Sequence, residues 1–388
     1  MPHIYGIEGD TTRLAERAAE ITRTTTAPHA QDVDQQARFP EESLAALGSE
    51  GLLGLCVDAK LGGKGQGPRA FAAVVEEIAQ GCGSTAMVYV MHVTAAQAIA
   101  ASATLKDREA LLRDIAKGKH LTTLALSERG SRSQFWAPVS TMIASDGGFQ
   151  TSAAKSWVTA AGHADSYVSS GQQPGAASPL ESTLYLVRRG APGVKVAGHF
   201  DGLGLRGNES APVSLDQMKV SNGDLITAQG QGAPAMLEVI LPWFALGTAA
   251  MANGLCRAAV GATAGHLSTA GFEHTGEKLR DLPGLRARLA QMSVRTEQSR
   301  ALLGYTLGEV ERPSPTTPLF VLQARLAAIE AAVEVTDLAM KACGGAAFSK
   351  HLPIERLFRD ARAGWVMAPT ADHLNDFVGR ALTGLPLF

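Results

Sequence analysis

Apolar residues recur at helical spacing through the first part of the chain. Leu14, Ala18 and Ile21 share one helical face, which predicts a first helix over residues 11–25. The same spacing predicts further helices at residues 44–52, 69–80, 84–102 and 107–117. We expect these helices to form an N-terminal helical domain over residues 1–119.

The pattern changes near His120 to short runs rich in β-branched and apolar residues. Leu121–Leu126 and Ser182–Val187 are typical of strands. Glycine pairs such as Gly147-Gly148 separate the runs and predict tight turns. We expect a small β-barrel or β-sandwich domain over residues 120–231.

Helical spacing returns after Gly232 and continues towards the C-terminus. It predicts three long helices and a shorter fourth, at residues 234–270, 283–311, 318–343 and 369–383. Helices joined by short connections pack as antiparallel neighbours, so we expect a C-terminal four-helix bundle over residues 232–388. The predicted fold class is therefore α+β and multidomain.

Charge and cysteine content exclude several classes of function. The chain has 388 residues and a net charge of −2, without the concentrated basic patch that nucleic acid binding requires. The richest apolar stretch, Val239–Ala252, contains Pro242 and Gly247 and indicates a buried helix rather than a membrane span. Four cysteines lie far apart and without metal-ligand spacing, which predicts no metal site and reduced thiols. No apolar signal segment stands near the N-terminus, so we expect a cytoplasmic protein.

Five short motifs follow one another along the chain. They lie at residues 51–79, 124–133, 155–159, 204–210 and 344–362. The second contains Ser127-Glu128-Arg129-Gly130, the third is Lys155-Ser156-Trp157-Val158-Thr159, and the fifth contains Arg359-Asp360-Ala361. In this order, and within this succession of helical, β and helical domains, the motifs resemble the acyl-CoA dehydrogenase family over nearly the whole chain.

The resemblance implies that the chain binds FAD. Leu126, Ser127 and Ser133 stand where the family contacts the flavin and its pyrophosphate, while Trp157 and Thr159 stand where it packs against and hydrogen-bonds the flavin ring. Further expected cofactor contacts are Lys341, Gly344, Gly345 and Thr370. The two glycines would let a neighbouring subunit's FAD approach the backbone, so a homodimer or homotetramer is also implied.

The catalytic carboxylate of the family is missing from this chain. Most members carry a Glu nine residues after the Arg of the Arg-Asp-Ala motif, and here that position is Ala368. A minority carry it on the first bundle helix, where Glu238 lies two residues away from the expected position. The candidate replacements are His92, on the helix that lines the acyl pocket in this fold, and Asp372, on the same helical face as Ala368.

Three functions remain open at this point. The first is α,β-dehydrogenation of an acyl thioester of CoA or acyl carrier protein, with an unusual base and an acceptor such as an electron-transfer flavoprotein. The second is an oxygen-dependent monooxygenase that uses reduced flavin on the same fold, as members that also lack the Glu do. The third is a non-catalytic binder of flavin or acyl thioester. The agreement of motifs favours the first, and Ala368 favours the other two.

Overall fold

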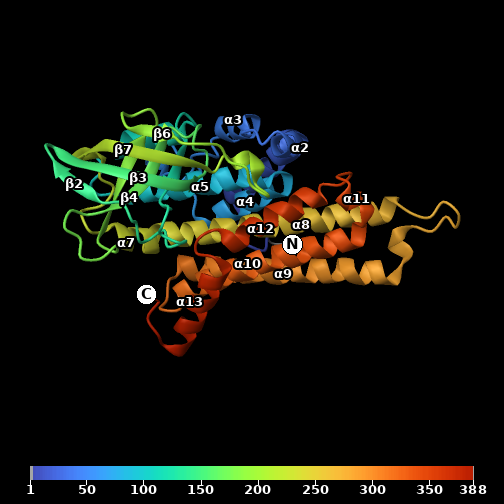
Figure 1. Cartoon of the computed structure of the whole chain (residues 1–388). Helices are drawn as coiled ribbons and strands as arrows, with labels where there is room; N and C mark the ends of the chain where they lie inside the picture. Colours follow the sequence, from blue (N-terminus) through green and yellow to red (C-terminus); the bar gives the residue numbers. More distant parts are fainter. Residues whose placement is uncertain (1–2, 388) are drawn as a thin grey trace.

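The computed structural model describes residues 3–387 and confirms the predicted succession of helical, β and helical parts (Figure 1). The N-terminal α-helices are α1 (Gly9–Ile21), α2 (Ala27–Gln35), α3 (Glu41–Ser49), α4 (Pro68–Gly81), α5 (Gly83–Ala100) and α6 (Arg108–Ala116). Helices α4 and α5 lie against each other and against the first long helix of the C-terminal part. Because α5 is buried on nearly all sides, its sequence is apolar with no polar face.

The helix predicted over residues 11–25 extends further than expected. After α1 the chain forms a π-helical turn at Thr22–Thr26 and then continues into α2. The sequence did not predict α2, because only two of its apolar residues, Ala30 and Val33, are buried and most of the rest is polar.

The strands form two sheets, which contact each other through β1 and β3. Their bounds are β1 (Thr122–Ala125), β2 (Met142–Ser145), β3 (Gly148–Val158), β4 (Ser166–Gln172), β5 (Ser182–Arg188), β6 (Val194–Val196) and β7 (Ala211–Ser221). One sheet has the order β1-β4-β5, with β1 and β4 parallel, and the other has the antiparallel order β2-β3-β7-β6. The first sheet packs on α5, which explains why its strands are buried along their length.

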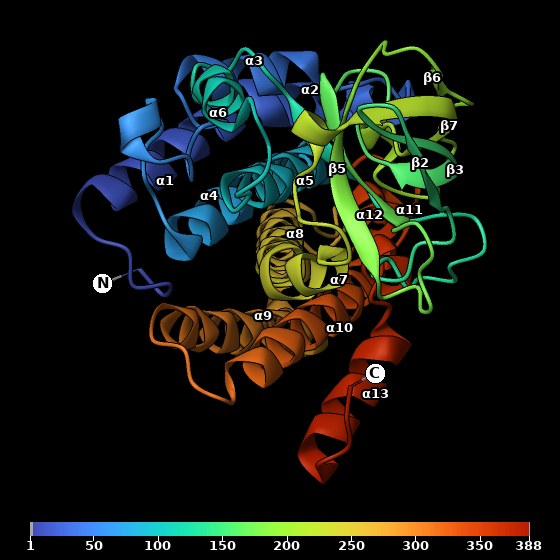
Figure 2. The ribbon, with the colours of Figure 1, turned by 90° about the vertical axis from the view of Figure 1, so that its left-hand side faces the viewer.

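The C-terminal part is built on three long helices. Its helices are α7 (Gly232–Ala235), α8 (Leu241–Thr269), α9 (Pro283–Glu311), α10 (Thr317–Cys343), α11 (Gly345–Phe348), α12 (Ile354–Val366) and α13 (Ala371–Thr383). Helix α12 was absent from the predicted set, yet it packs against both α8 and α10. Helix α13, the predicted fourth helix, packs against α10 and α12 and leans away from the bundle (Figure 2).

Helix α8 with the turns before it, Gly232–Thr269, is long and apolar enough to cross a membrane by length and composition alone. Of its most apolar window, 61% is buried inside the protein, where α8 contacts α4, α9 and α10. These contacts are those of a central core helix. The proposed domain divisions, after residues 119 and 231, fall in the connections between α6 and β1 and between β7 and α7.

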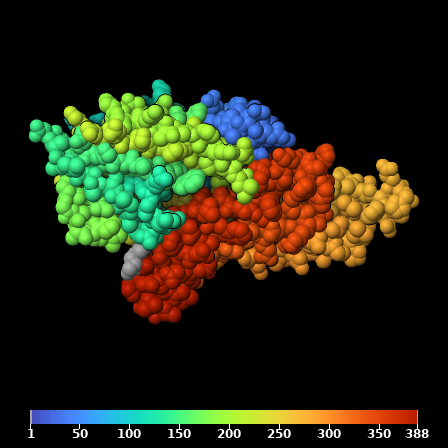
Figure 3. All heavy atoms as spheres, viewed as in Figure 1, coloured from blue at the N-terminus to red at the C-terminus, as the bar shows by residue number. Residues whose placement is uncertain are grey.

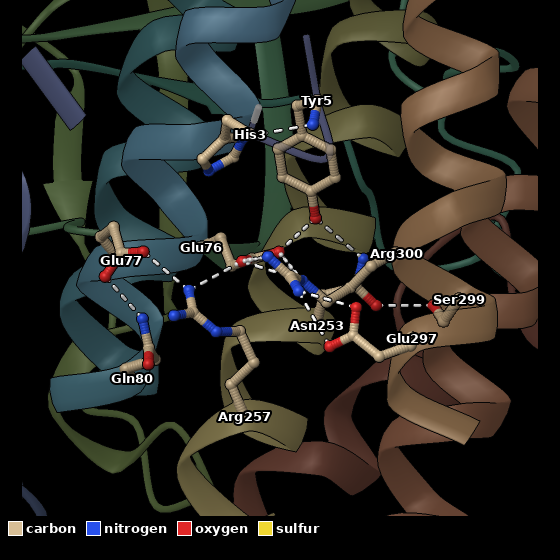
Figure 4. A network of polar contacts seen from close by, with 10 residues as sticks. All are labelled: His3, Tyr5, Glu76, Glu77, Gln80, Asn253, Arg257, Glu297, Ser299 and Arg300. Carbon is tan, nitrogen blue, oxygen red and sulfur yellow. Dashed lines mark hydrogen bonds and ion pairs between the residues drawn. The ribbon is translucent and has the colours of Figure 1, made fainter. Parts of the chain in front are cut away.

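A buried polar cluster joins the N-terminal helices to the bundle (Figure 4). Glu76 of α4 is fully buried and pairs with Arg257 of α8 at 2.8 Å and Arg300 of α9 at 2.9 Å. The Tyr5 hydroxyl donates to the same carboxylate and accepts from the Asn253 amide at 3.1 Å. Because both carboxylate oxygens are satisfied by donors from three elements, Glu76 fixes the mutual positions of α4, α8 and α9.

Replacing Glu76 by Gln should destabilise the fold strongly, because it leaves two arginines beside an uncharged buried partner. Breaking a buried ion pair from one side typically costs about 3–5 kcal/mol, and we expect a loss of about 3 kcal/mol in the free energy of unfolding. The matched control is Glu77→Gln on the same helix, since Glu77 also contacts Arg257 at 2.7 Å but is partly exposed. Denaturant unfolding should show a loss below about 1 kcal/mol for this control. Equal losses in the two variants would contradict the role of the cluster.

Candidate active site

A cavity of about 1350 Å³ lies between the β domain and the C-terminal helices. Its walls come from the loop after β1, strand β3, the segment of residues 200–205, the start of α8 and the end of α12. On the face shown in Figure 3 the green β domain lies directly against the red C-terminal helices. Pockets for a single small ligand typically measure about 300–1,000 Å³, so this cavity can hold more than one.

Trp157 presents a large aromatic face to the cavity from strand β3. The pairing of β3 with β7 shifts register between Lys155 and Val158, and Trp157 in this bulge has φ +57°. That left-handed conformation is strained for a bulky residue, and it turns the indole out of the sheet so that 69% of Trp157 is exposed. Phe200 stands edge-on to the indole, with ring centroids 6.4 Å apart.

A buried ion pair fixes the β wall beside Trp157. The Lys155 Nζ lies 2.6 Å from the Glu128 carboxylate and also donates to the Ser170 carbonyl at 2.7 Å. Glu128 further accepts from the backbone amides of Val139 and Ser140 at 2.8 and 2.6 Å. Burial alone would raise the pKa of Glu128, but Lys155 and these donors outweigh it and lower that pKa. Glu128 is therefore a structural anion.

The loop after β1 carries two basic side chains into the cavity wall. Arg129 and Arg132 are exposed, line the cavity and form no ion pair with a described residue. Arg132 and Ser133 have φ of +51° and +68°, so this turn keeps a tight left-handed form without glycine. Unpaired guanidinium groups beside free hydroxyls suit a phosphate-bearing ligand.

The structure places the expected flavin-contacting residues of the β domain together. Leu126, Ser127, Ser133, Trp157 and Thr159 all line the cavity. The Thr159 and Ser210 hydroxyls share a hydrogen bond of 3.0 Å, which fixes the Thr159 side chain at the cavity surface. Ser210, the last residue of the fourth motif, also lines the cavity.

The opposite wall is apolar and comes from the bundle. Phe244 at the start of α8 faces the end of α12, where Trp365, Val366 and Met367 lead to Ala368. The position at which the family carries its Glu therefore lies at the cavity, but a methyl group cannot accept a proton. The sequence did not single out Phe244 and Trp365 as cavity residues. An aromatic residue on a bundle helix follows the same apolar periodicity whether it packs in the core or lines a cavity.

His92 does not reach the cavity, and the expected catalytic role requires correction. It is completely buried on α5, where Nε2 lies 3.1 Å from the Leu53 carbonyl and Nδ1 accepts from the Thr122 amide at 3.1 Å. Burial lowers the pKa of His92 to about 4, so the ring stays neutral at pH 7. His92 ties α5 to β1 and to the chain after α3, which is a structural role.

The other expected residues also lie outside the cavity lining. Asp372 is exposed in the first turn of α13, and Thr370 caps that helix by accepting from the His373 amide at 3.3 Å. Glu238 is exposed before α8. Lys341, Gly344 and Gly345 are exposed where α10 ends, towards the end of the bundle away from the β domain (Figure 1). Their expected contact is with a neighbouring subunit's cofactor, and it stays a prediction.

Among the described residues, two carboxylates line the cavity, Glu128 and Asp201. Glu128 is committed to Lys155, whereas Asp201 is exposed and pairs at the surface with Arg206 at 3.2 Å. A third carboxylate, Asp360 of α12, lies behind the wall and accepts from the Leu205 amide at 2.6 Å. Gly204 beside it has no room for a side chain, because a Cβ would lie 2.4 Å from the Arg359 carbonyl. Asp360 thus holds the segment of residues 200–205 against α12.

Comparison with known proteins defines the class. Family models for the N-terminal, middle and C-terminal domains of acyl-CoA dehydrogenases match residues 9–119, 123–218 and 230–383. The chain belongs to the acyl-CoA dehydrogenase family, whose members are FAD-dependent oxidoreductases.

Individual relatives agree with this assignment over nearly the full length. The mitochondrial short-chain specific acyl-CoA dehydrogenase of Bos taurus is 27% identical over 346 residues, covering 89% of this chain and 83% of the relative. The butyryl-CoA dehydrogenase of Megasphaera elsdenii superposes with a TM-score of 0.91 at 21% identity, over 97% of this chain and 99% of that one. The FAD complex of PigA superposes with a TM-score of 0.89 at 18% identity, over 97% and 98% of the two chains.

The cavity fits FAD on its own features. Trp157 offers a flat apolar surface for the flavin ring, and the Ser127 and Thr159 hydroxyls stand beside it as hydrogen-bonding groups. Arg129 and Arg132 supply positive charge for a pyrophosphate. The remaining volume, bounded by Phe244 and the end of α12, leaves space for an acyl chain next to the ring.

Trp157→Ala should weaken FAD binding, because it removes the aromatic face against which we expect the flavin ring to pack. Aromatic contacts add about 0.5–1.5 kcal/mol beyond the area they bury, so we expect the dissociation constant to rise at least about 10-fold. Trp157→Phe, which keeps a ring, should retain most of the affinity. Flavin fluorescence titration measures both. Unchanged affinity in the alanine variant would place the flavin elsewhere.

Asp360 predicts a specific pH dependence of stability. Burial raises the pKa of Asp360 from 3.8 to about 6. Because the pKa is higher in the folded protein, the protonated carboxyl stabilises the fold fully below about pH 4. This contribution to the free energy of unfolding, about 3 kcal/mol, is lost as the pH rises through 6. Wild-type protein should therefore lose this much more stability than Asp360→Asn between pH 4 and 7 in denaturant unfolding. If the free energy of unfolding changed with pH in the same way in the two proteins, the predicted titration of Asp360 would be contradicted.

Proposed function

We propose that this protein oxidises the α,β carbon–carbon bond of an acyl thioester of CoA or acyl carrier protein, using FAD held in the cavity between the β domain and the bundle. The observation that carries the proposal is the cavity itself, which joins the aromatic, hydroxyl-bearing β wall at Trp157 and Thr159 to an apolar wall at Phe244 and Ala368. FAD, when bound, supplies the hydride acceptor, and the apolar wall excludes water from the acyl chain.

The α-proton requires a base other than residue 368. Glu128 is held by Lys155 and keeps a lowered pKa, and His92 is locked in the core, so neither can serve. Asp201 is the remaining carboxylate among the described lining residues, on the segment that Asp360 holds against α12. We propose Asp201 as the general base.

A second candidate function is oxygen-dependent monooxygenation by reduced flavin. It is favoured by the alanine at position 368, because stabilising an oxygenated flavin needs no carboxylate there. The two candidates also differ in the electron acceptor, which is an electron-transfer flavoprotein in the first and O₂ in the second. In either case we propose a cytoplasmic homodimer or homotetramer.

Anaerobic mixing of FAD-loaded protein with a panel of acyl-CoA thioesters tests the proposal. We expect at least one thioester to bleach the flavin absorbance. Asp201→Asn should slow this reduction by about 10²-fold or more, the usual contribution of a general base. The matched control is Asp216→Asn on β7, an exposed carboxylate outside the cavity lining, which should leave the rate unchanged.

Two results would contradict the proposal. If no thioester bleached the flavin, while the pre-reduced protein formed an oxygenated intermediate with O₂, the monooxygenase would be the correct function. If the flavin of the Asp201→Asn variant were reduced at the wild-type rate, the proposed dehydrogenation would still hold, but Asp201 would not be its general base.

A further inference from the structure

Arg325 of α10 is a fully buried cation next to the cavity wall. Its side chain is completely inaccessible to solvent, and its neighbours along the helix are mostly apolar. Its Nη2 donates to the Met367 carbonyl at 3.0 Å, and its guanidinium carbon lies 4.8 Å from the centroid of the Phe244 ring. Met367 and Phe244 both line the cavity, so the guanidinium lies one side chain behind the apolar wall.

The charge of Arg325 is not balanced by the protein. Its Nε and Nη1 have no hydrogen-bond partner among residues 3–387, and no described carboxylate pairs with it. Burial accordingly lowers the pKa of Arg325 to about 9. Arg359, which lines the same cavity, pairs instead with the carboxylates of Asp34 and Glu355. An unpaired buried cation is costly, because burial removes its hydration without replacing it.

The position of this cation coincides with the missing carboxylate. Met367, which accepts from Arg325, directly precedes Ala368, so the guanidinium lies beside the residue where the family carries a Glu. Ala368 carries no charge, so it cannot balance the Arg325 guanidinium. The acyl end of the cavity therefore favours an anion, and that anion must come from the ligand.

We propose that Arg325 forms a subsite for a carboxylate on the acyl group, so that the preferred ligand is an acyl thioester whose chain ends in an anionic group. This inference rests on the proposed function, because it assumes that an acyl thioester enters the cavity. Phe244 lies over the guanidinium and lines the cavity, so its side chain would have to move aside for the carboxylate to accept a hydrogen bond from one of the two nitrogens without a partner, Nε or Nη1.

Binding of two thioesters of equal length tests the proposal. Glutaryl-CoA and valeryl-CoA differ only in a terminal carboxylate against a methyl group. We would measure both by anaerobic calorimetry on FAD-loaded protein whose flavin has been reduced beforehand, so that no acyl group is oxidised. A charge-assisted hydrogen bond predicts that glutaryl-CoA binds at least about 10-fold tighter.

Variants at position 325 separate charge from packing. Arg325→Gln keeps a donor for the Met367 carbonyl but has no charge, so it should lose the preference while valeryl-CoA affinity stays within about 3-fold. Arg325→Lys keeps the charge and should keep a preference. Thermal unfolding and FAD affinity of each variant show whether it is folded, and the wild-type comparison stands even if one variant does not fold.

Equal affinity of the wild-type protein for the two thioesters would overturn the carboxylate subsite and leave the proposed function intact. If Arg325→Gln still preferred glutaryl-CoA, the Arg325 subsite would also be overturned, because a different group would then recognise the carboxylate. Failure of glutaryl-CoA to bind would overturn the subsite, whereas the proposed function would still be decided by flavin reduction across the thioester panel.

Discussion

The buried ion pair between Glu128 and Lys155 fixes the β-domain wall of the cavity in which we expect the flavin to bind. Glu128 follows β1 and opens the loop that carries Ser133, while Lys155 lies in β3 two residues before Trp157. Two buried charges are stable only when further groups satisfy them, and here Ser140, Val139 and the Ser170 carbonyl do so. The pair thereby sets the loop, the bulge and the aromatic face at fixed positions.

The bundle side of the cavity combines an apolar wall with the buried cation Arg325 behind it. Ala368 lies where the family's Glu would project, and the buried Arg325 stands behind it without a carboxylate partner among the described residues. The β-domain wall and the apolar bundle wall of the cavity therefore differ in character. The first carries the residues at which we expect the flavin to bind. The second, with Ala368 and the arginine behind it, is the basis of our proposals for the base and the ligand.

The sequence predicted the β wall well because its motifs are local. Ser127, Trp157 and Thr159 stand on a strand and a loop whose neighbours in sequence are also their neighbours in space. Helical residues were harder to place. His92 lies on a helix that is buried all round, so periodicity could not distinguish a cavity-lining histidine from one that hydrogen-bonds backbone groups in the core. Asp372 shares a helical period with Ala368, but the chain turns between them and α13 begins only after Thr370.

The central claim is that the Glu128–Lys155 pair builds the flavin site, and a double-mutant cycle on FAD affinity tests it most directly. Fluorescence titration would compare the wild type with Glu128→Gln, Lys155→Met and the double variant. Each single change removes one charge of the buried pair and leaves the remaining group without its ionic partner. We therefore predict that each weakens FAD binding by about 10-fold or more, and that the double change weakens it by less than the two effects combined. Wild-type FAD affinity in folded single variants would contradict the account.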